Sequence, residues 1–267
     1  MVDDFFKDLS AKNLSSKTIR FYTIDINQFQ KFINKDIKET STENLQLFIS
    51  FLTENDFKTQ SIIRKVCTII TLLRWAKSKE LITQEISFKS LNFPENITEQ
   101  KKELSNEQIL NLINTIEKSK SKRKLRDSVL YKLLIFRGLK TQEVQNIKIE
   151  NVNLVDNVIK IIRTPKRKTY VNPFYIDIGF IKEDVRLLIN SRVSGLLFVN
   201  KYNQKLSIRS IRRDLAYYAK LAGIKINPST LRYSFAQKRS LTDDFKILSQ
   251  RLGHNSLQST KKMLKYV

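Results

Sequence analysis

Histidine and cysteine, which build many catalytic and metal sites, occur only once each in this chain, as His254 and Cys67. One of each excludes a disulfide framework, a Cys/His zinc site, a His-Glu-x-x-His metalloprotease site and a Cys-His dyad built from adjacent motifs. The glycines stand far apart, so they form neither a P-loop nor a dinucleotide-binding fingerprint. Lys and Arg are the functional side chains present in excess.

The 49 Lys and Arg residues outnumber the 26 Asp and Glu residues, which gives a net charge of +23 over 267 residues. Such a charge attracts polyanions and favours them through counterion release. An anionic membrane surface usually needs one basic amphipathic segment, whereas here the cations are spread over the whole chain. Nucleic acid is therefore the favoured partner. We expect a cytoplasmic protein, because no apolar run could span a bilayer and the first residues lack a signal peptide's basic region.

Four short stretches combine basic residues with a characteristic spacing. The first two are Phe136–Glu143 (FRGLKTQE) and Lys166–Pro173 (KRKTYVNP), and the latter belongs to an expected hairpin whose basic tip is Thr164–Lys168. The other two are Ser229–Ala236 (STLRYSFA) and Leu252–Thr260 (LGHNSLQST).

These stretches resemble motifs of the tyrosine recombinases, the phage integrase and Xer-type family. In order, they match the family's tGLRisE, its basic hairpin, HdLRHtfA and LGHssisTT, and the last is the most specific. The resemblance covers nearly the whole chain. It implies a mainly α protein: an N-terminal helical, SAM-like core-binding domain, then an α+β catalytic domain with a small antiparallel sheet.

The resemblance also implies a reaction. In this family a tyrosine attacks a DNA phosphate, leaving a 3′-phosphotyrosyl link and a free 5′-hydroxyl, and neither metal nor cofactor is required. Two fixed cations stabilise the charge that develops on the phosphate, and a third group serves the leaving oxygen. Mapped onto this chain, Arg232 falls on the second arginine, Lys168 on the hairpin lysine and His254 on the second histidine position. Lys166 is the substitute for Lys168 if the register slips.

Three positions depart from the family pattern. Lys140 stands at the first arginine position, where it keeps the charge but loses the planar fork, and Arg137, three residues earlier, is the candidate to compensate. Ser229 stands at the first histidine position and can donate a hydrogen bond, although its role could equally be an N-cap after Pro228. Met263 stands at the nucleophile position, nine residues after His254. A thioether cannot attack phosphate, so Tyr266 is the candidate nucleophile if the last helix slips or the loop after Gly253 differs.

The elements that must position these residues follow from periodicity. Residues 1–93 contain neither Gly nor Pro, which predicts a helical unit. Ser15-Ser16 caps a first amphipathic helix, Thr40 with Glu43 forms a capping box for a second, and a third runs from Thr59 to Ala76. Cations on the outer side of the third helix are candidates for phosphate contact: Lys58, Arg64 and Lys65. We expect a core-binding domain over 1–80, a linker over 81–104 and the catalytic domain over 105–267.

In the second domain, Ser105 with Gln108 forms a capping box, Gly138 ends an apolar helix and Thr141 caps a short one. Strands are expected over Asn157–Arg163 and Thr169–Pro173. Helices are expected over Ile181–Asn190, Ser207–Ala222, Ser229–Ser240 and Asp244–Leu252. The helix at Ser207–Ala222 presents three candidates for contact with DNA backbone or a guanine edge: Arg209, Arg212 and Arg213.

Three functions remain open from the sequence. The protein could be a site-specific DNA strand transferase that uses Tyr266. It could be a catalytically silent, DNA-binding relative that occupies sites or assists an active partner. More remotely, it could be a basic helical protein that uses only its charge, in replication or RNA binding. The expected partners are double-stranded DNA and a second copy or a related recombinase, with no membrane and no small-molecule cofactor.

Overall fold

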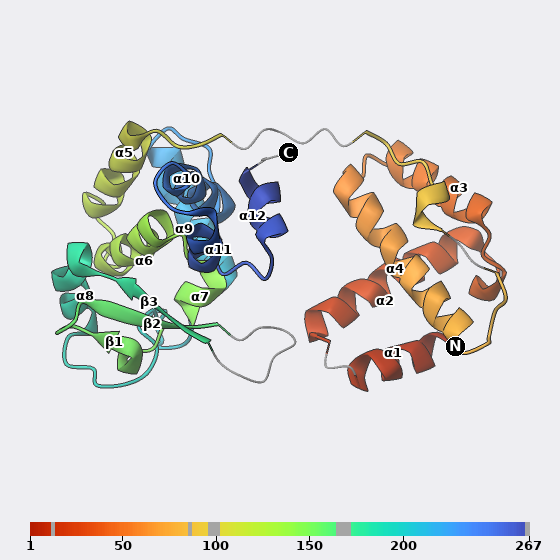
Figure 1. Ribbon diagram of the computed structural model, residues 1–267, viewed down its shortest axis with the longest axis horizontal. Helices are drawn as coiled ribbons and strands as arrows, with labels where there is room; N and C mark the ends of the chain where they lie inside the picture. Colours follow the sequence, from red (N-terminus) through yellow and green to blue (C-terminus); the bar gives the residue numbers. More distant parts are fainter. Residues whose placement is uncertain (12–13, 85–86, 96–101, 164–171, 265–267) are drawn as a thin grey trace. The chain divides into compact units, whose positions relative to one another are not determined.

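The computed structural model describes residues 1–11, 14–84, 87–95, 102–163 and 172–264. The chain divides into two compact units, Met1–Glu99 and Gln100–Val267, and each has its own apolar core (Figure 1). Within the described residues, no helix is both long and apolar enough to cross a membrane.

The first unit is helical, as its sequence predicts. Its helices are α1 (Val2–Ala11), α2 (Ser16–Ile33), α3 (Thr42–Glu54) and α4 (Thr59–Ser78), with short 3-10 turns at Ile37–Glu39 and Phe88–Ser90. Helix α4 packs against each of the other three (Figure 1). Its buried face repeats at helical spacing, with Ile62, Val66, Ile69 and Leu73 turned inward.

The helix caps of the first unit show how far local sequence determines a boundary. The predicted cap of α2 is confirmed, because the Ser15 side chain accepts a hydrogen bond from the Thr18 amide. The predicted capping box of α3 is shifted by one residue. Ser41 caps the helix and Asn44 completes the box, while the buried Thr40 hydroxyl donates to the Ile37 carbonyl. Thr40 is therefore used by the preceding 3-10 turn and is not free to cap α3.

The second unit surrounds a small sheet with helices. Its helices are α5 (Asn106–Glu117), α6 (Lys124–Arg137), α7 (Thr141–Gln145), α8 (Lys182–Ile189), α9 (Ile208–Leu221), α10 (Pro228–Ser240), α11 (Phe245–Leu252) and α12 (Leu257–Leu264). Further 3-10 turns lie at Ile149–Asn151 and Gly179–Ile181. The predicted Ser105–Gln108 capping box of α5 is confirmed.

The sheet contains β1 (Val152–Asn153), β2 (Val158–Arg163) and β3 (Asn172–Asp177), paired antiparallel in that order. Arg163 pairs with Asn172 and Ile159 pairs with Ile176. The predicted second strand, Thr169–Pro173, ends too early in the chain. Its first three residues fall outside the described residues, and β3 continues to Asp177 because buried Ile176 faces the core.

Two glycines permit close approaches that position the site. Gly138 ends α6 with φ of +60°, and a Cβ atom there would lie 2.3 Å from the Phe235 ring of α10. Gly253 ends α11 with φ of +58°, and a Cβ atom there would lie 2.8 Å from Nε of Arg163. Both glycines thus combine a left-handed backbone with a neighbour that leaves no room for a side chain.

Helices α10, α11 and α12 share a small apolar cluster of their own. Its buried residues are Phe235, Ala236, Leu248, Leu252 and Leu264. The cluster fixes the carboxyl end of α11, and the following turn with His254, against α10. The packing of these three helices therefore determines where His254 lies relative to Arg232.

Candidate functional site

Arg232 is fixed by the ends of two other helices. It lies in the first half of α10 between buried neighbours, and its guanidinium donates to the Gly138 carbonyl at 2.5 Å and also to the Leu252 carbonyl. Burial lowers the pKa of this guanidinium to about 10, so it stays charged at neutral pH. The result is a rigid cation whose remaining N–H groups can serve a ligand.

Lys140 begins α7 and lies beside Arg232. Its main-chain N–H donates to Glu143 Oε2 at 2.8 Å, and its Nζ donates to the Gly253 carbonyl at 3.0 Å. Lys140, and not Thr141, is thus the residue at the N-cap, because Glu143 satisfies its amide. Burial lowers the pKa of the Lys140 ammonium, and the positive charges of Arg232 and Arg163 lower it further.

Arg163 is a member of this cluster that the sequence analysis missed. It lies at the end of β2 and donates from Nε to Glu143 Oε1 at 2.8 Å, and to the carbonyls of Gln250 and Arg251 at 2.7 and 2.8 Å. The two-residue repeat of β2 could have predicted its position. Arg163 follows buried Ile159 and Ile161 at intervals of two residues, and an arginine on a buried strand face needs partners.

The cations of the cluster converge on the carboxyl end of α11. The carbonyls of four successive residues, 250 to 253, accept hydrogen bonds from Arg163, Arg232 and Lys140. The last carbonyls of a helix have no partners within it and carry a partial negative charge. This helix end therefore holds three cations close together with little opposing formal charge.

His254 follows Gly253 directly and stands at the edge of the cluster, as its sequence context predicts. Its Nδ1 lies 2.7 Å from Oγ1 of Thr260, which is fully buried in α12. Burial lowers the pKa of the imidazole to about 4, helped by the positive charges of Arg232, Lys140 and Arg163. His254 is thus neutral at physiological pH and can donate or accept a hydrogen bond, but it does not add a positive charge.

A cavity of about 430 Å³ opens beside Lys140 and Arg232. It is lined by Leu139, Lys140, Thr141, Arg212, Asn227, Pro228, Ser229 and Arg232. Three cations from α7, α9 and α10 thus border one space, together with the first turn of α10. An open, cationic cavity at the start of a helix is suited to an anion such as phosphate.

Ser229 borders this cavity and does not cap α10. Asn227 is the N-cap, and its side chain accepts hydrogen bonds from the amides of Ser229 and Thr230 at 2.8 and 3.1 Å. The predicted N-cap role of Ser229 is therefore wrong, because the residue before Pro228 already fills it. The exposed Ser229 hydroxyl remains available to a ligand.

Two predicted site residues, Lys168 and Tyr266, lie outside the described residues, and so does Lys166. Met263 is partly buried and packs against the cluster shared by α10, α11 and α12. Arg137 does not join the site. Its guanidinium binds Asp177 at 2.6 Å and lies over the ring of Phe180. The proposed leaving-group acid and nucleophile thus remain predictions.

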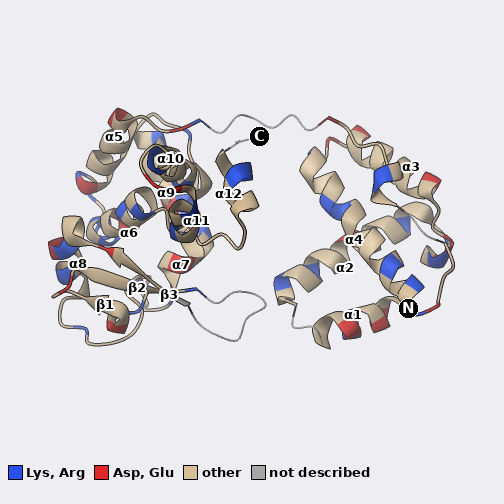
Figure 2. Cartoon of the chain, viewed as in Figure 1, with Lys and Arg blue, Asp and Glu red and all other residues tan. Residues whose placement is uncertain are grey.

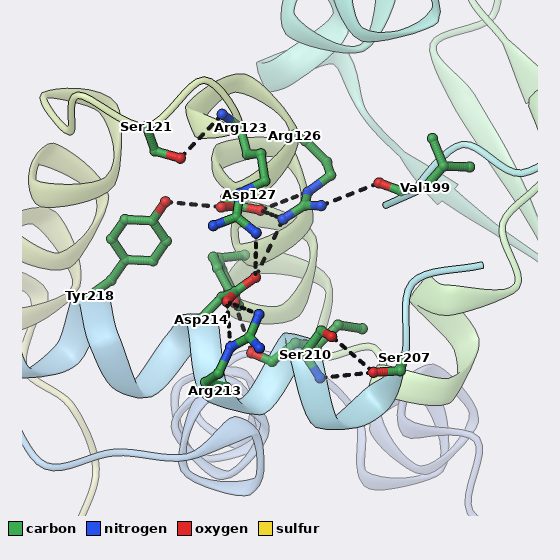
Figure 3. Close-up of polar contacts among 12 residues, drawn as sticks. Ser121, Arg123, Arg126, Asp127, Val199, Ser207, Ser210, Arg213, Asp214 and Tyr218 are labelled. Atoms are coloured by element: carbon green, nitrogen blue, oxygen red, sulfur yellow. Dashed lines mark hydrogen bonds and ion pairs between the residues drawn. The ribbon is translucent and has the colours of Figure 1, made fainter. Parts of the chain in front are cut away.

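The three arginines of α9 differ in their surroundings. Arg209 is exposed, Arg212 borders the cavity, and Arg213 pairs with Asp214 at 3.1 Å. Asp214 belongs to a buried network that joins α9 to α6 (Figure 3). In it, Arg126 donates to Asp127 at 2.8 Å and to Asp214 at 3.4 Å, and the Tyr218 hydroxyl donates to Asp127 at 2.9 Å.

The three cations predicted on the outer side of α4 also differ in their exposure to solvent. Lys58 is exposed, but the expectation that Lys65 faces outward is wrong, because it is only 5% exposed. Lys65 and Arg64 both bind Asp25, a fully buried residue of α2, and Thr68 donates to the same carboxylate at 3.2 Å. A buried carboxylate needs such partners, so Lys65 serves the core of the first unit. Elsewhere, Lys and Arg are spread over the helices of both units (Figure 2).

The model of the phage integrase family matches residues 102–265, and that of the phage integrase N-terminal SAM-like domain matches residues 2–80. Tyrosine recombinase XerA of Pyrococcus furiosus is 29% identical, over 98% of this chain and 87% of its own.

Two solved structures share the fold. The Tn1549 transposon integrase in complex with circular intermediate DNA aligns with a TM-score of 0.77 and 14% identity, over 94% of this chain and 90% of its own. A lambda integrase dimer bound to a COC′ core site aligns with a TM-score of 0.75 and 16% identity, over 98% and 75%. The expected mainly α fold, with a SAM-like domain before a catalytic-type domain, is confirmed.

Proposed function

The chain belongs to the phage integrase family, the tyrosine recombinases, and from this premise we propose that it binds duplex DNA and cuts and rejoins the strands at specific sites. The observation that supports this most directly is the cavity bordered by Lys140, Arg212 and Arg232. The relatives that are solved with DNA, one of them as a dimer, support a DNA substrate and self-association on it. A protein that acts on DNA works where the DNA lies, so a cytoplasmic location belongs to this proposal.

The proposed reaction assigns each group a task. The Tyr266 oxygen attacks the phosphorus atom while the bond to the 5′ oxygen breaks. Arg232 and Lys140 stabilise the charge that develops on the non-bridging oxygens. Lys168 gives a proton to the leaving 5′ oxygen, and neutral His254 accepts the proton of the phenol. Attack by a 5′-hydroxyl on the phosphotyrosyl link then reseals a strand and releases the tyrosine.

One observation favours a second function. Met263 occupies the position of the family's nucleophile and packs against the cluster shared by α10, α11 and α12. If the last helix keeps this packing during the reaction, the chain binds DNA without cutting it. It then acts as a silent relative that occupies sites or assists an active recombinase.

Trapping of a covalent adduct separates the two functions. A binding site is first selected from a pool of random duplexes, and nicked versions of that site are then incubated with the protein. The strand transferase forms an adduct that resists detergent and is lost in Tyr266→Phe. Tyr202→Phe, which alters a tyrosine that is 67% exposed, is the matched control and should form the adduct as wild type does.

Absence of an adduct on a proven binding site would favour the silent relative. An adduct that survives in Tyr266→Phe would exclude Tyr266 as the nucleophile. A charge-only binder would instead yield no preferred sequence and would lose affinity steeply with salt.

A further inference from the structure

The proposed site lacks one forked donor. The family pattern has an arginine where this chain has Lys140, and an ammonium is a point charge that cannot bind two phosphate oxygens as a planar guanidinium does. Moreover, Nζ of Lys140 donates to the Gly253 carbonyl at 3.0 Å. Among the described residues of the family motifs, Arg232 is thus the guanidinium that lies at the site.

Arg212 brings a second guanidinium to the same space. It belongs to α9, which contains none of the four family motifs. It nevertheless borders the cavity, together with Lys140, Ser229 and Arg232. Its side chain is exposed, and among the described residues it has no hydrogen bond or ion pair. Its neighbour Arg213, by contrast, is paired with Asp214. Arg212 is therefore a charged group at the cavity that no described carboxylate neutralises.

The backbone around Arg212 is held firmly. The Tyr131 hydroxyl donates to the Ile211 carbonyl at 2.8 Å, and Asp214 binds Arg126 on α6. Ile211 and Leu215 are buried on either side. This anchoring fixes where the Arg212 side chain begins, which lowers the cost of ordering it on a ligand. Ser229, which borders the same cavity, is smaller than the histidine of the family pattern and fills less of the cavity.

We propose that Arg212 binds the scissile phosphate as the second guanidinium of this site, in place of the fork that Lys140 lacks. This inference rests on the proposed strand-transfer function. Arg212 makes and breaks no covalent bond. Its N–H groups stabilise the charge on the non-bridging oxygens in the transition state, together with Arg232.

The test separates DNA binding from cleavage. The dissociation constant for the selected site and the single-turnover rate of adduct formation are measured for Arg212→Ala. The matched control is Arg186→Ala, which removes an exposed guanidinium of α8 that lies outside the cavity lining. We expect Arg212→Ala to slow adduct formation by about 10²–10³-fold, the loss typical of a donor to a developing oxyanion. The DNA affinity of Arg212→Ala, and both the affinity and the rate of Arg186→Ala, should change by less than about fivefold.

Rescue makes the test specific. Lys140→Arg restores the forked donor of the family pattern. The double variant Lys140→Arg with Arg212→Ala should therefore form the adduct at least tenfold faster than Arg212→Ala alone. Equal cleavage rates for Arg212→Ala and Arg186→Ala would overturn the inference. So would a rate loss that Lys140→Arg does not restore, since a merely structural role of Arg212 predicts that result.

If wild type forms no adduct, inorganic phosphate serves as the probe. The guanidinium Nε–H signals of the full chain are followed by NMR during a phosphate titration. Coupled shifts of the Arg212 and Arg232 signals, with the Arg186 signal unmoved, would support the shared anion site although the proposed reaction fails. A response of Arg232 without Arg212 would overturn the inference.

Discussion

Two clusters of cations in the second unit differ in what balances their charge. Between α6 and α9, Arg126 faces two carboxylates, Asp127 and Asp214 (Figure 3). At the cavity, Lys140 and Arg232 are held mainly by backbone carbonyls, and Glu143 is the carboxylate that pairs with Arg163. Carbonyls fix the position of a cation without cancelling its charge. The first cluster is therefore complete by itself, whereas the second has a surplus of positive charge that an anion would balance.

Among these variants, we expect the removal of Arg232 from the cavity cluster to have the largest effect, on the rate of adduct formation. Arg232→Ala deletes the fixed guanidinium from the proposed phosphate site, so we expect adduct formation to slow by about 10³-fold. DNA affinity should fall only slightly, because many other cations contribute to it. Single-turnover kinetics on the selected site provide the measurement. A rate within tenfold of wild type would place the chemistry elsewhere.

Removal of Asp127 should instead affect stability. Asp127→Ala leaves Arg126 buried without its nearest carboxylate and the Tyr218 hydroxyl without its acceptor. We expect a loss of about 3–5 kcal/mol, the usual cost of breaking a buried ion pair. For a unit of this size, that loss lowers the unfolding midpoint by roughly 10 °C.

Calorimetry measures the midpoint, and the cleavage rate of the variant well below that temperature should match wild type. A large loss of cleavage rate in Asp127→Ala, with an unchanged unfolding midpoint, would contradict the structural role assigned to the cluster between α6 and α9.

The substitution Gly138→Ala tests the close packing of α10 against Gly138, whose carbonyl accepts a hydrogen bond from Arg232. In Gly138→Ala the new Cβ would clash with the Phe235 ring at 2.3 Å, and the backbone has φ of +60°. We expect a loss of about 2–4 kcal/mol from overpacking and backbone strain. Gly223→Ala is the matched control, because it has φ of +68° but no heavy atom within 4 Å of the added Cβ.

The control should cost only about 1 kcal/mol in denaturant unfolding, from backbone strain alone. Equal losses for the two variants would mean that α10 does not restrict Gly138.

The smallest effect concerns His254. Its pKa of about 4 lies below the ordinary value of 6.5, so between these pH values the unfolded chain binds more protons than the folded one. Stability should therefore rise with pH across this window and decline as pH falls from 6.5 towards 4. Because the chain has a single histidine, its NMR titration is unambiguous. A midpoint above 6 would show that neither burial nor the neighbouring cations lower the pKa of the imidazole.

Local patterns predicted most of the helices, because capping residues and apolar periodicity are properties of short segments. The caps at Ser15 and Ser105 and the helix end at left-handed Gly138 are confirmed. The cap at Thr40 was wrong by one residue because the preceding turn uses its side chain, and the predicted second strand ended too early because its pairing with β2 continues to Asp177.

Long-range pairs were harder to predict than local ones. Lys65 was expected outside, but Asp25 on a different helix draws it inward. Arg163 was missed because its partners, Glu143 and the carbonyls of α11, come from distant parts of the chain. Family motifs indicated Arg232 and His254, yet no motif indicated that Arg212 borders the same cavity.

A crystal structure of the protein on its selected DNA site would test the central claim most directly. The uncompensated charge at the cavity predicts one backbone phosphate there, within hydrogen-bonding distance of the Arg232 and Arg212 guanidinium groups. Asp127, Asp214 and Arg126 should stay paired with one another and make no DNA contact. A complex in which the DNA backbone bypasses this cavity, and no phosphate contacts Arg232, would contradict the account.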